Sequence, residues 1–554
     1  MKVLDWLRLK VLDLLGLGKY GGPNELERLT FISDSDRLLK SRIREYNIWY
    51  DGDGEELLNF YTRENTIGYN YEPFYSRNKR NYFWAISSTE NDVKRSHSGQ
   101  PRNIVDTLVS IIKFPLITAG GLDSENSAVN QNLQAILKDS KLKELYRQEQ
   151  LPLTLVEGWG CYKINWDEDL SEYPIPVYYR AENVDFIYKM GRVIAIVFKD
   201  YYVDKNNRKY MLAETRRFGK NQAGKRTLVI ENELFRAGED GEYVNKVELS
   251  ELPETAGIQG YIEIGSDDRD MNLLLAVPCI LFRNTSNIGG YGRSIFTGKI
   301  DLFDDLDQCL SQAANCVRKS TPVEYMNSDY LERDSNGLAK QPHSYDRKYV
   351  VVNGARGADG ESKGEAVQVT QPQVNFEQYS NQAISIMLQI INGVMSPATL
   401  GIDISKKDNA EAQREKEKVT IFTRNLIIDS ETDILRDLCS QLLCAYEMMR
   451  TGAITCDEYE VSLKFSEFAD DSYENKLEKL GAAYDSENIS DEMFMQKLYG
   501  DTLSRADYDK ELKWLKEHHS QHREDAYQGA AGGGANFPGM ANNMMNAYED
   551  EEEI

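Results

Sequence analysis

Residues 300–319 read IDLFDDLDQCLSQAANCVRK, and residues 375–394 read NFEQYSNQAISIMLQIINGV. In both stretches apolar side chains recur every three or four residues, which predicts two amphipathic helices, the first extending from Ser294 to Lys319. The segment between them, residues 321–374, has short Val- and Tyr-rich runs around the Gly-rich loop NGARGADGESKGE and predicts a compact insertion with strands. A helix hairpin of this kind has little core of its own. We therefore expect it to pack sideways against copies of itself.

Charge is unevenly distributed along the first helix. Acidic residues lie toward its start and basic residues at its end, which is the arrangement that the helix dipole favours. These residues are Asp301, Asp304, Asp305 and Asp307, followed by Arg318 and Lys319. The apolar positions predict a packing face made of Leu302, Phe303, Leu306, Leu310, Ala313, Ala314 and Val317.

The second helix is followed by MSPATLGIDISKKDNAEAQ, residues 395–413. Pro397, Gly401 and the polar run from Ser405 to Asn409 indicate an exposed loop, and a highly charged helix is expected to continue from it to about Gly452. Lys406 and Lys407 stand in this loop on an otherwise acidic protein. They are candidates for contact with a polyanion, and a solvated loop explains them equally well.

Composition limits the class of protein. The chain has 554 residues and a formal charge of −25, from 90 acidic and 65 basic residues. At roughly 100–200 residues per domain it holds several domains. The acidic excess argues against a protein that grips nucleic acid by neutralising phosphates. It suits a surface past which DNA slides without adhering, and it suits a surface selected for solubility.

The rest of the chain predicts an α+β protein that is mainly helical. Residues 25–115 read as helices, including one from Pro101 to Pro115, and residues 151–290 read as short antiparallel strands whose spacing is typical of a β-sandwich or barrel. Residues 455–468 alternate as a strand. Residues 470–525 predict further helices, one of them capped by Ser490, and the Gly-rich acidic tail, residues 526–554, is expected to be disordered.

Residues 1–24 predict a short amphipathic helix ended by Gly16 and Gly18. Charged residues interrupt its apolar positions, so a secretory signal is not expected. We expect this helix to dock on another subunit or on the body of the chain, with a membrane-surface role as the alternative. No stretch reaches the 18 apolar residues of a spanning helix.

Motifs for catalysis, cofactors or metals are weak. GYGRSIFTGKI, residues 290–300, has the look of a phosphate loop, but its glycine spacing is wrong and Lys299 precedes Ile. His518, His519 and His522 permit a metal site, although an exposed polar face explains them better. The seven cysteines form no CxxC pair and suit a reducing cytoplasm. We expect no enzyme activity, no cofactor and no metal.

The order of predicted elements resembles that of the portal proteins of tailed bacteriophages, especially long-tailed phages of Gram-positive hosts. Those proteins also have a helical and β-rich wing, a stem helix, a clip, a second stem helix, a tunnel loop, a long kinked wing helix and a crown. Four phrases resemble stretches at corresponding places. They are IREYNIWYDGD, KRSHSGQPRNIVDTLVSIIKFPLI, NGVMSPATLGIDISKKDNAEAQREKEKV, and VSLKFSEF followed by ENISDEMFMQKL.

The resemblance implies a domain plan: wing 25–293, stem helices 294–320 and 375–395, clip 321–374, tunnel loop 396–409, kinked wing helix and strand 410–469, and crown 470–525. In the tunnel loop it implies that Ser405, Lys406, Lys407 and Asn409 face DNA. In the stem it implies that the channel is lined by Asp301, Asp304, Asp305, Asp307, Arg318 and Lys319.

For function, the resemblance implies a ring of twelve subunits, a head-to-tail connector at one capsid vertex of the virion, assembled in the host cytoplasm. Double-stranded DNA would pass through the ring during genome packaging and ejection. The expected partners are terminase, the head-completion adaptor, and the major capsid and scaffold proteins, with no membrane. The alternatives are a capsid or head-completion protein without a channel, and a packaging nuclease or ATPase.

Overall fold

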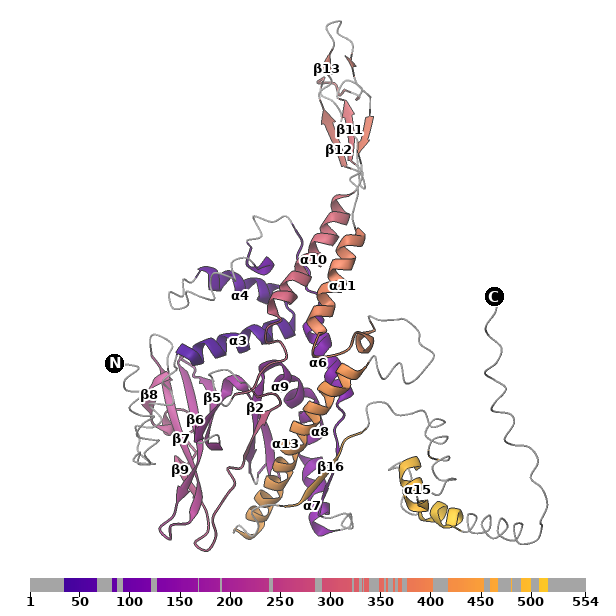
Figure 1. The fold of residues 1–554 in the computed structure, drawn as a ribbon. Helices are drawn as coiled ribbons and strands as arrows, with labels where there is room; N and C mark the ends of the chain where they lie inside the picture. Colours follow the sequence, from indigo (N-terminus) through magenta and orange to yellow (C-terminus); the bar gives the residue numbers. More distant parts are fainter. Residues whose placement is uncertain are drawn as a thin grey trace, which may run out of the picture. The chain divides into compact units, whose positions relative to one another are not determined.

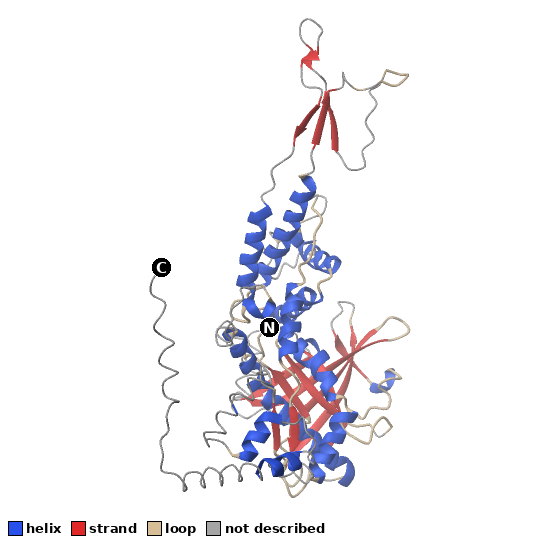
Figure 2. Cartoon of the chain, turned by 90° about the vertical axis from the view of Figure 1, so that its right-hand side faces the viewer, coloured by secondary structure: helices blue, strands red, loops and turns tan. Residues whose placement is uncertain are grey.

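The structure is a computed structural model whose helices and strands are shown in Figures 1 and 2. The chain divides into two compact units, Met1–Ser466 and Glu467–Ile554. The described residues are 34–66, 82–86, 93–120, 127–167, 169–189, 192–238, 243–283, 291–320, 323–327, 331, 333–337, 348–352, 355–356, 362–363, 367–370, 376–401, 417–452, 459–466, 480, 490–499 and 508–516. The fold is a mixture of helices and several mostly antiparallel sheets, so the predicted α+β class is confirmed at that level.

The first described part of the chain is helical, with sequence signals at the ends of its helices. Pro101 lies in the first turn of a helix, where its missing N–H costs nothing. The Ser127 hydroxyl accepts a hydrogen bond from Asn130 N at 3.1 Å and so caps another. The elements are α3 (Asp34–Asp51), α4 (Gly54–Thr66), η1 (Phe83–Ala85), α6 (Gln100–Ile111), β1 (Leu116–Ala119), α7 (Ala128–Asp139), α8 (Leu142–Leu145), the π-helical turn η2 (Tyr146–Gln150) and α9 (Leu151–Glu157).

Two antiparallel sheets follow. The larger has the order β4-β5-β6-β7-β8, with β9 also paired to β7, and the smaller has the order β10-β2-β3. The two edge strands β4 and β8 do not pair with each other, so the sheet of described strands is open. Of the two predicted alternatives, a β-sandwich or a barrel, the barrel is therefore wrong. The strands are β2 (Trp159–Asn165), β3 (Ile175–Arg180), β4 (Val184–Lys189), β5 (Arg192–Val203), β6 (Lys209–Lys220), β7 (Arg226–Ala237), β8 (Tyr243–Val247), β9 (Tyr261–Ile264) and β10 (Ala276–Ile280).

A buried guanidinium joins the two sheets. Arg216 of β6 is 2% exposed and donates to the Ile164 carbonyl at 2.9 Å and to Asn165 Oδ1 at 3.1 Å, both on β2. Glu214 balances its charge at 2.7 Å and also pairs with Lys163 of β2 at 2.6 Å. Burial opposes ionisation of Glu214, but the two cations hold its pKa below the ordinary value. The sheets are therefore held together by paired charges as well as by apolar packing.

The predicted helix hairpin is present, although its first helix begins at Ile300 and not at Ser294 as predicted. α10 (Ile300–Lys319) and α11 (Phe376–Ile391) pack against each other, and the insertion lies beyond one end of the pair (Figures 1 and 2). Within the insertion, β12 pairs with β11 in parallel and β15 pairs with β11 in antiparallel orientation. The strands are β11 (Val323–Asn327), β12 (Lys348–Val352), β13 (Ala355–Arg356), β14 (Ser362–Lys363) and β15 (Val367–Thr370). The three main strands occur where the Val- and Tyr-rich runs predict them.

A long helix, α13 (Lys418–Thr451), belongs to the first unit. Its carboxyl cap is Gly452, whose backbone has the left-handed conformation. The short turn η6 (Pro397–Leu400) precedes it in the described residues, and β16 (Val461–Lys464) follows it and pairs with β1. One hydrophobic core runs from α3 through α9, β2 and β10 to α10, α11 and α13. None of the helices among the described residues is long and apolar enough to cross a membrane.

The second unit is described in part. α15 (Asp491–Tyr499) is preceded by Ser490, whose hydroxyl accepts a hydrogen bond from Met493 N at 3.3 Å, so the predicted cap is confirmed. Phe494 and Met495 form a small core with side chains that include Tyr508 and Leu512. The predicted amphipathic helix 1–24 and the tail 526–554 lie outside the described residues.

Candidate functional site

The helix pair is the candidate functional site because rows of exposed side chains run along both of its helices. Its inner contact is apolar: Leu306 and Ala313 of α10 are buried, as are Ala383 and Ile390 of α11. Phe303 of α10 is also buried, and its ring packs on Trp49 and Phe296. Sulfur contacts add to this packing, with Cys309 Sγ 3.5 Å from the Tyr379 carbonyl oxygen and Cys316 Sγ 3.5 Å from the Tyr379 hydroxyl. The face that the sequence predicts for α10 is therefore only partly its contact with α11.

A second side of α10 contacts residues 82–84, which precede α6 in the chain. Asp304 accepts hydrogen bonds from the backbone N–H groups of Phe83 and Trp84 at 2.7 and 3.3 Å, and Tyr82 donates to Asp301. Asp304 is 3% exposed. Burial raises the pKa of Asp304 to about 7, although the two backbone donors favour its ionised form.

One turn further along, Asp307 is fully buried and accepts three hydrogen bonds. The donors are Trp84 Nε1 at 3.0 Å, Ser98 N at 2.8 Å and His97 Nδ1 at 2.7 Å. Ser311 continues the row, since its hydroxyl accepts from Ser96 N at 3.0 Å. Positions 304, 307 and 311 share one helix face, so these side chains fix α10 to residues 83–84 and 96–98.

The remaining two sides of α10 are open. At helical spacing, one is polar, with Asp301 and Asp305 exposed and then three half-buried amides: Gln308, Gln312 and Asn315. The other lies across the helix axis and is apolar, with Leu310 39% and Val317 49% exposed and Ala314 between them. α11 shows the same division, because Ile384 and Leu388 are each 40% exposed beside a separate polar row. That row consists of Gln378, Gln382, Ser385 and Gln389.

The predicted stem residues therefore separate into groups. Asp304 and Asp307 are buried, so their prediction as channel-lining residues is wrong: they satisfy backbone and ring N–H groups inside the protein. Asp301, Asp305 and Arg318 are exposed. Lys319 ends α10, and its side chain lies outside what the structure describes.

The tunnel-loop candidates lie outside the described residues, because the description stops at Gly401 and resumes at residue 417. They are Ser405, Lys406, Lys407 and Asn409. The described turn before the loop lines a polar hollow of about 420 Å³ with one face of α6. Thr399 and Leu400 contribute from the turn, and Asn103, Asp106 and Thr107 contribute from α6.

The stretch that has the look of a phosphate loop has a structural role. Gly292 packs against the chain where α9 ends, and a Cβ added to it would lie 1.8 Å from the Gly158 carbonyl oxygen, so only glycine fits. Lys299 Nζ donates to the Ile390 carbonyl at 2.5 Å and to the Asn392 carbonyl at 3.0 Å. It therefore caps the carboxyl end of α11, where a cation is favourable.

Within the described ranges, no group of three His, Cys, Asp or Glu side chains is placed to hold a metal ion. The candidate ligands His518, His519 and His522 lie beyond residue 516, outside those ranges.

Sequence reasoning missed the importance of His97, Trp84 and the two serines beside His97. Their signal is weak, since a lone polar segment gives no indication of its distant partner. Asp304, Asp307 and Ser311 do recur at spacings of three and four within an otherwise apolar side of α10. This recurrence is the available sign of a buried polar contact.

Comparison with known proteins gives little support for a family assignment. No family model matches the chain, and no curated protein matches it. A chain of the solved structure described as "Neck of native GTA particle computed with C12 symmetry" is similar to it at 12% identity, with a TM-score of 0.29. That match covers 74% of this chain and 90% of the other. A similarity of this degree does not establish a shared function.

Proposed function

We propose that the chain is a portal subunit, one of a ring of copies that encloses a channel for double-stranded DNA at a capsid vertex. The observation that carries the proposal is the helix pair with its insertion, in which α10 has a polar open side and an apolar open side. A ring subunit needs both kinds of surface, one toward water in the channel and one toward its neighbour. The four phrases that resemble portal proteins support the same assignment.

The apolar side supports contact between copies. Apolar side chains of both helices remain exposed to water, because two helices alone cannot bury all of their apolar surface. These side chains are Leu310 and Val317 of α10 and Ile384 and Leu388 of α11. Covering these side chains with those of a second copy would stabilise the assembly by roughly 25 cal/mol for each square ångström removed from water. A head-to-tail repetition of this contact closes a ring when the rotation per subunit allows it.

The polar side supports a channel wall that does not hold DNA. The polar rows contain carboxylates and amides but no Lys or Arg along most of the described length of α10 and α11. The basic residues, Arg318 and Lys319, lie at the carboxyl end of α10. Phosphate binding depends on Lys and Arg, so such a wall lets a duplex pass without arresting it. In this proposal the chain is a conduit with no catalytic role. The insertion meets terminase and later the head-completion adaptor, and the wing meets capsid and scaffold proteins.

The experiment is negative-stain microscopy and native mass measurement of the purified full chain, with paired variants of α10. We expect annular particles of twelve copies from the unaltered chain. Leu310→Asp with Val317→Asp should give folded protein without rings, because buried carboxylates would face the neighbour. Gln312→Asp with Asn315→Asp adds the same charge to the polar side and should still give rings. Absence of rings from the unaltered chain, or equal ring formation by both variants, would contradict the proposal.

A capsid or head-completion protein without a channel is the other candidate. It predicts closed shells, sheets or monomers in the same micrographs. A packaging nuclease or ATPase predicts magnesium-dependent DNA cleavage or ATP turnover by the purified chain.

A further inference from the structure

The two-stranded sheet of β1 and β16 is closed on one side and open on the other. On the outer edge of β1, Ala119 N donates to Asn130 Oδ1 at 3.0 Å, and the Ile117 carbonyl accepts from Gln134 Nε2 at 2.8 Å. Both partners are side chains of α7, so this edge cannot receive another strand. β1 and β16 are antiparallel, with Thr118 opposite Ser462.

Among the residues that the structure describes, none covers the outer edge of β16 in this way. Hydrogen-bonded and non-hydrogen-bonded pairs alternate along an antiparallel ladder. Gly120 N donates to the Glu460 carbonyl at 2.9 Å, so the even-numbered residues of β16 bond to β1. Val461 and Leu463 therefore direct their N–H and C=O groups away from β1. These backbone groups have no hydrogen-bond partner among the described residues.

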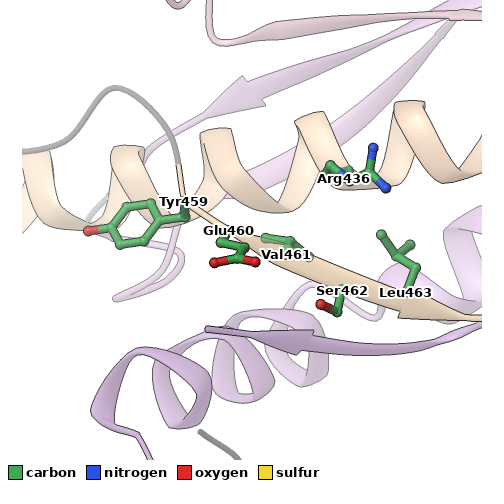
Figure 3. Close-up of a pocket in the computed structure, with 6 residues that line it drawn as sticks. All are labelled: Arg436, Tyr459, Glu460, Val461, Ser462 and Leu463. Atoms are coloured by element: carbon green, nitrogen blue, oxygen red, sulfur yellow. The ribbon is translucent and has the colours of Figure 1, made fainter. Parts of the chain in front are cut away.

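The open edge lies along a groove of about 590 Å³ between β16 and α13 (Figure 3). Arg436 of α13 forms one wall, and Tyr459 with residues 460–463 forms the other. Val461 is buried against the core, whereas Glu460, Ser462 and Lys464 are exposed on the opposite face of the strand. An exposed strand edge beside a hollow is a place where an added strand can pair.

The sequence of β16 identifies the strand that fits. Residues 460–464 read EVSLK, which is complementary to itself when reversed. Pairing two copies in antiparallel register about Ser462 places Glu460 of one copy opposite Lys464 of the other, twice. The same register places Val461 opposite Leu463 of the second copy, and these are the residues whose backbone groups point outward. Neither Glu460 nor Lys464 has an ion pair within the described part of the chain.

We propose that β16 is a self-pairing edge, through which two copies of this chain join their β1–β16 sheets into one four-stranded antiparallel sheet across a two-fold axis. Opposite charges facing each other across strands stabilise such a pair and select its register. The contact is isologous, with the same surface on both copies. It is therefore distinct from the head-to-tail contacts of a ring, and joins two unassembled subunits or two rings.

Disulfide trapping tests the register. In the proposed pair the two Ser462 residues form a non-hydrogen-bonded pair with Cα atoms about 4.5 Å apart, within the range that a disulfide spans. We expect the full chain with Ser462→Cys to form a cross-linked dimer under mild oxidation. Lys464→Cys alone should not, but an equal mixture of Glu460→Cys and Lys464→Cys chains should cross-link. The unaltered chain measures the background from its own cysteines. Cross-linking of Ser462→Cys no greater than that of the unaltered chain or of Lys464→Cys would overturn the proposal.

Charge exchange tests the same pairing without new cysteines. Glu460→Lys and Lys464→Glu each place like charges opposite each other, so each alone should lower the dimer fraction measured by sedimentation several-fold. The double variant restores opposite pairs and should recover the dimer. All of these measurements are repeated in the Leu310→Asp, Val317→Asp chain, which is expected not to form rings. Dimers that persist there separate this contact from the proposed ring, and failure of the double variant to recover them would overturn the pairing.

Discussion

His97 Nδ1 lies 2.7 Å from Asp307 Oδ2, which joins the segment before α6 to a helix 210 residues later in the chain. The side chains are 9% and 0% exposed. Because Trp84 and Ser98 donate to the same carboxylate, the base of the helix pair is fixed by a polar contact inside the protein. The orientation of the open faces of α10 thus depends on residues that touch neither face.

Removing the Asp307 carboxylate tests how much this contact stabilises the fold. Asp307→Ala leaves three donors, one buried and two partly buried, without an acceptor. It should lower the free energy of unfolding by about 3–5 kcal/mol, because each unsatisfied buried donor costs about 1–3 kcal/mol. Denaturant unfolding followed by tryptophan fluorescence measures it, since Trp84 is one of the donors. Asp305→Ala on the exposed side is the control and should change it by less than about 0.5 kcal/mol. Equal losses in the two variants would contradict the assigned role.

Stability should also fall as pH rises, because of Glu431. This residue of α13 is fully buried, one of its oxygens accepts from Gln150 Nε2 at 2.8 Å, and the other has no hydrogen-bond partner among the described residues. Burial raises its pKa to about 8. The unfolded chain ionises near the ordinary carboxyl pKa while the folded chain stays protonated. Stability is therefore complete below that value and is lost up to about pH 8, by at most about 1.4 kcal/mol for each pH unit.

Glu431→Gln should reduce this slope, because a neutral amide keeps the contact with Gln150 and does not titrate, and the part that remains includes the contribution of Asp304. Melting temperatures between pH 5 and pH 8 measure the effect, with the variant melting higher at pH 8. Asp433→Asn, on the exposed side of the same helix, is the control and should keep the slope of the unaltered chain. A variant that loses stability with pH as steeply as the unaltered chain would show that Glu431 is not the group responsible.

The helix hairpin could be predicted from sequence because its signals are local. Apolar spacing gives α10 and α11, and Val- and Tyr-rich runs give β11, β12 and β15. Which acidic residues of α10 are buried could not be predicted in the same way. Asp304 and Asp305 are neighbours of the same type, yet one is buried and the other exposed. Which is buried depends on where residues 82–86 and 93–98 pack, and the local pattern of α10 does not identify that distant partner.

The apolar residues of α10 also lie on more than one face of the helix. Leu310 and Val317 read as part of the packing face, but the fold leaves them exposed while Phe303 and Leu306 are buried. A helix that is apolar on two sides needs an apolar neighbour on each, and among the described residues nothing covers Leu310 and Val317 as α11 covers the other apolar side. Similarly, the composition of the strands predicted a sheet region but not whether the sheet closes into a barrel. Closure depends on the pairing of the edge strands, which is decided by long-range register.

Lys299 gives a test of the helix pair at its base. Lys299→Ala removes the donor to the Ile390 and Asn392 carbonyls at the end of α11. We expect the free energy of unfolding to fall by about 1.5–3 kcal/mol, the usual contribution of hydrogen bonds to a charged group. Urea unfolding measures the change. Arg318→Ala removes an exposed cation from the other end of α10 and should have little effect. A larger loss from Arg318→Ala would show that the cap is not the stabilising contact.

The loop lysines give a test at the level of function. If Lys406 and Lys407 guide DNA, replacing both by Glu changes the local charge by four units and repels phosphates. We expect rings to form normally while the amount of DNA packaged or retained falls at least several-fold. Lys205→Glu with Lys209→Glu makes the same charge change at exposed positions of the hairpin between β5 and β6, so it controls for net charge. The measurement is nuclease-protected DNA in capsids assembled with each variant. Equal packaging by both variants would remove the loop lysines from the mechanism and leave the polar faces of the helix pair, with their carboxylates and amides, as the proposed channel surface.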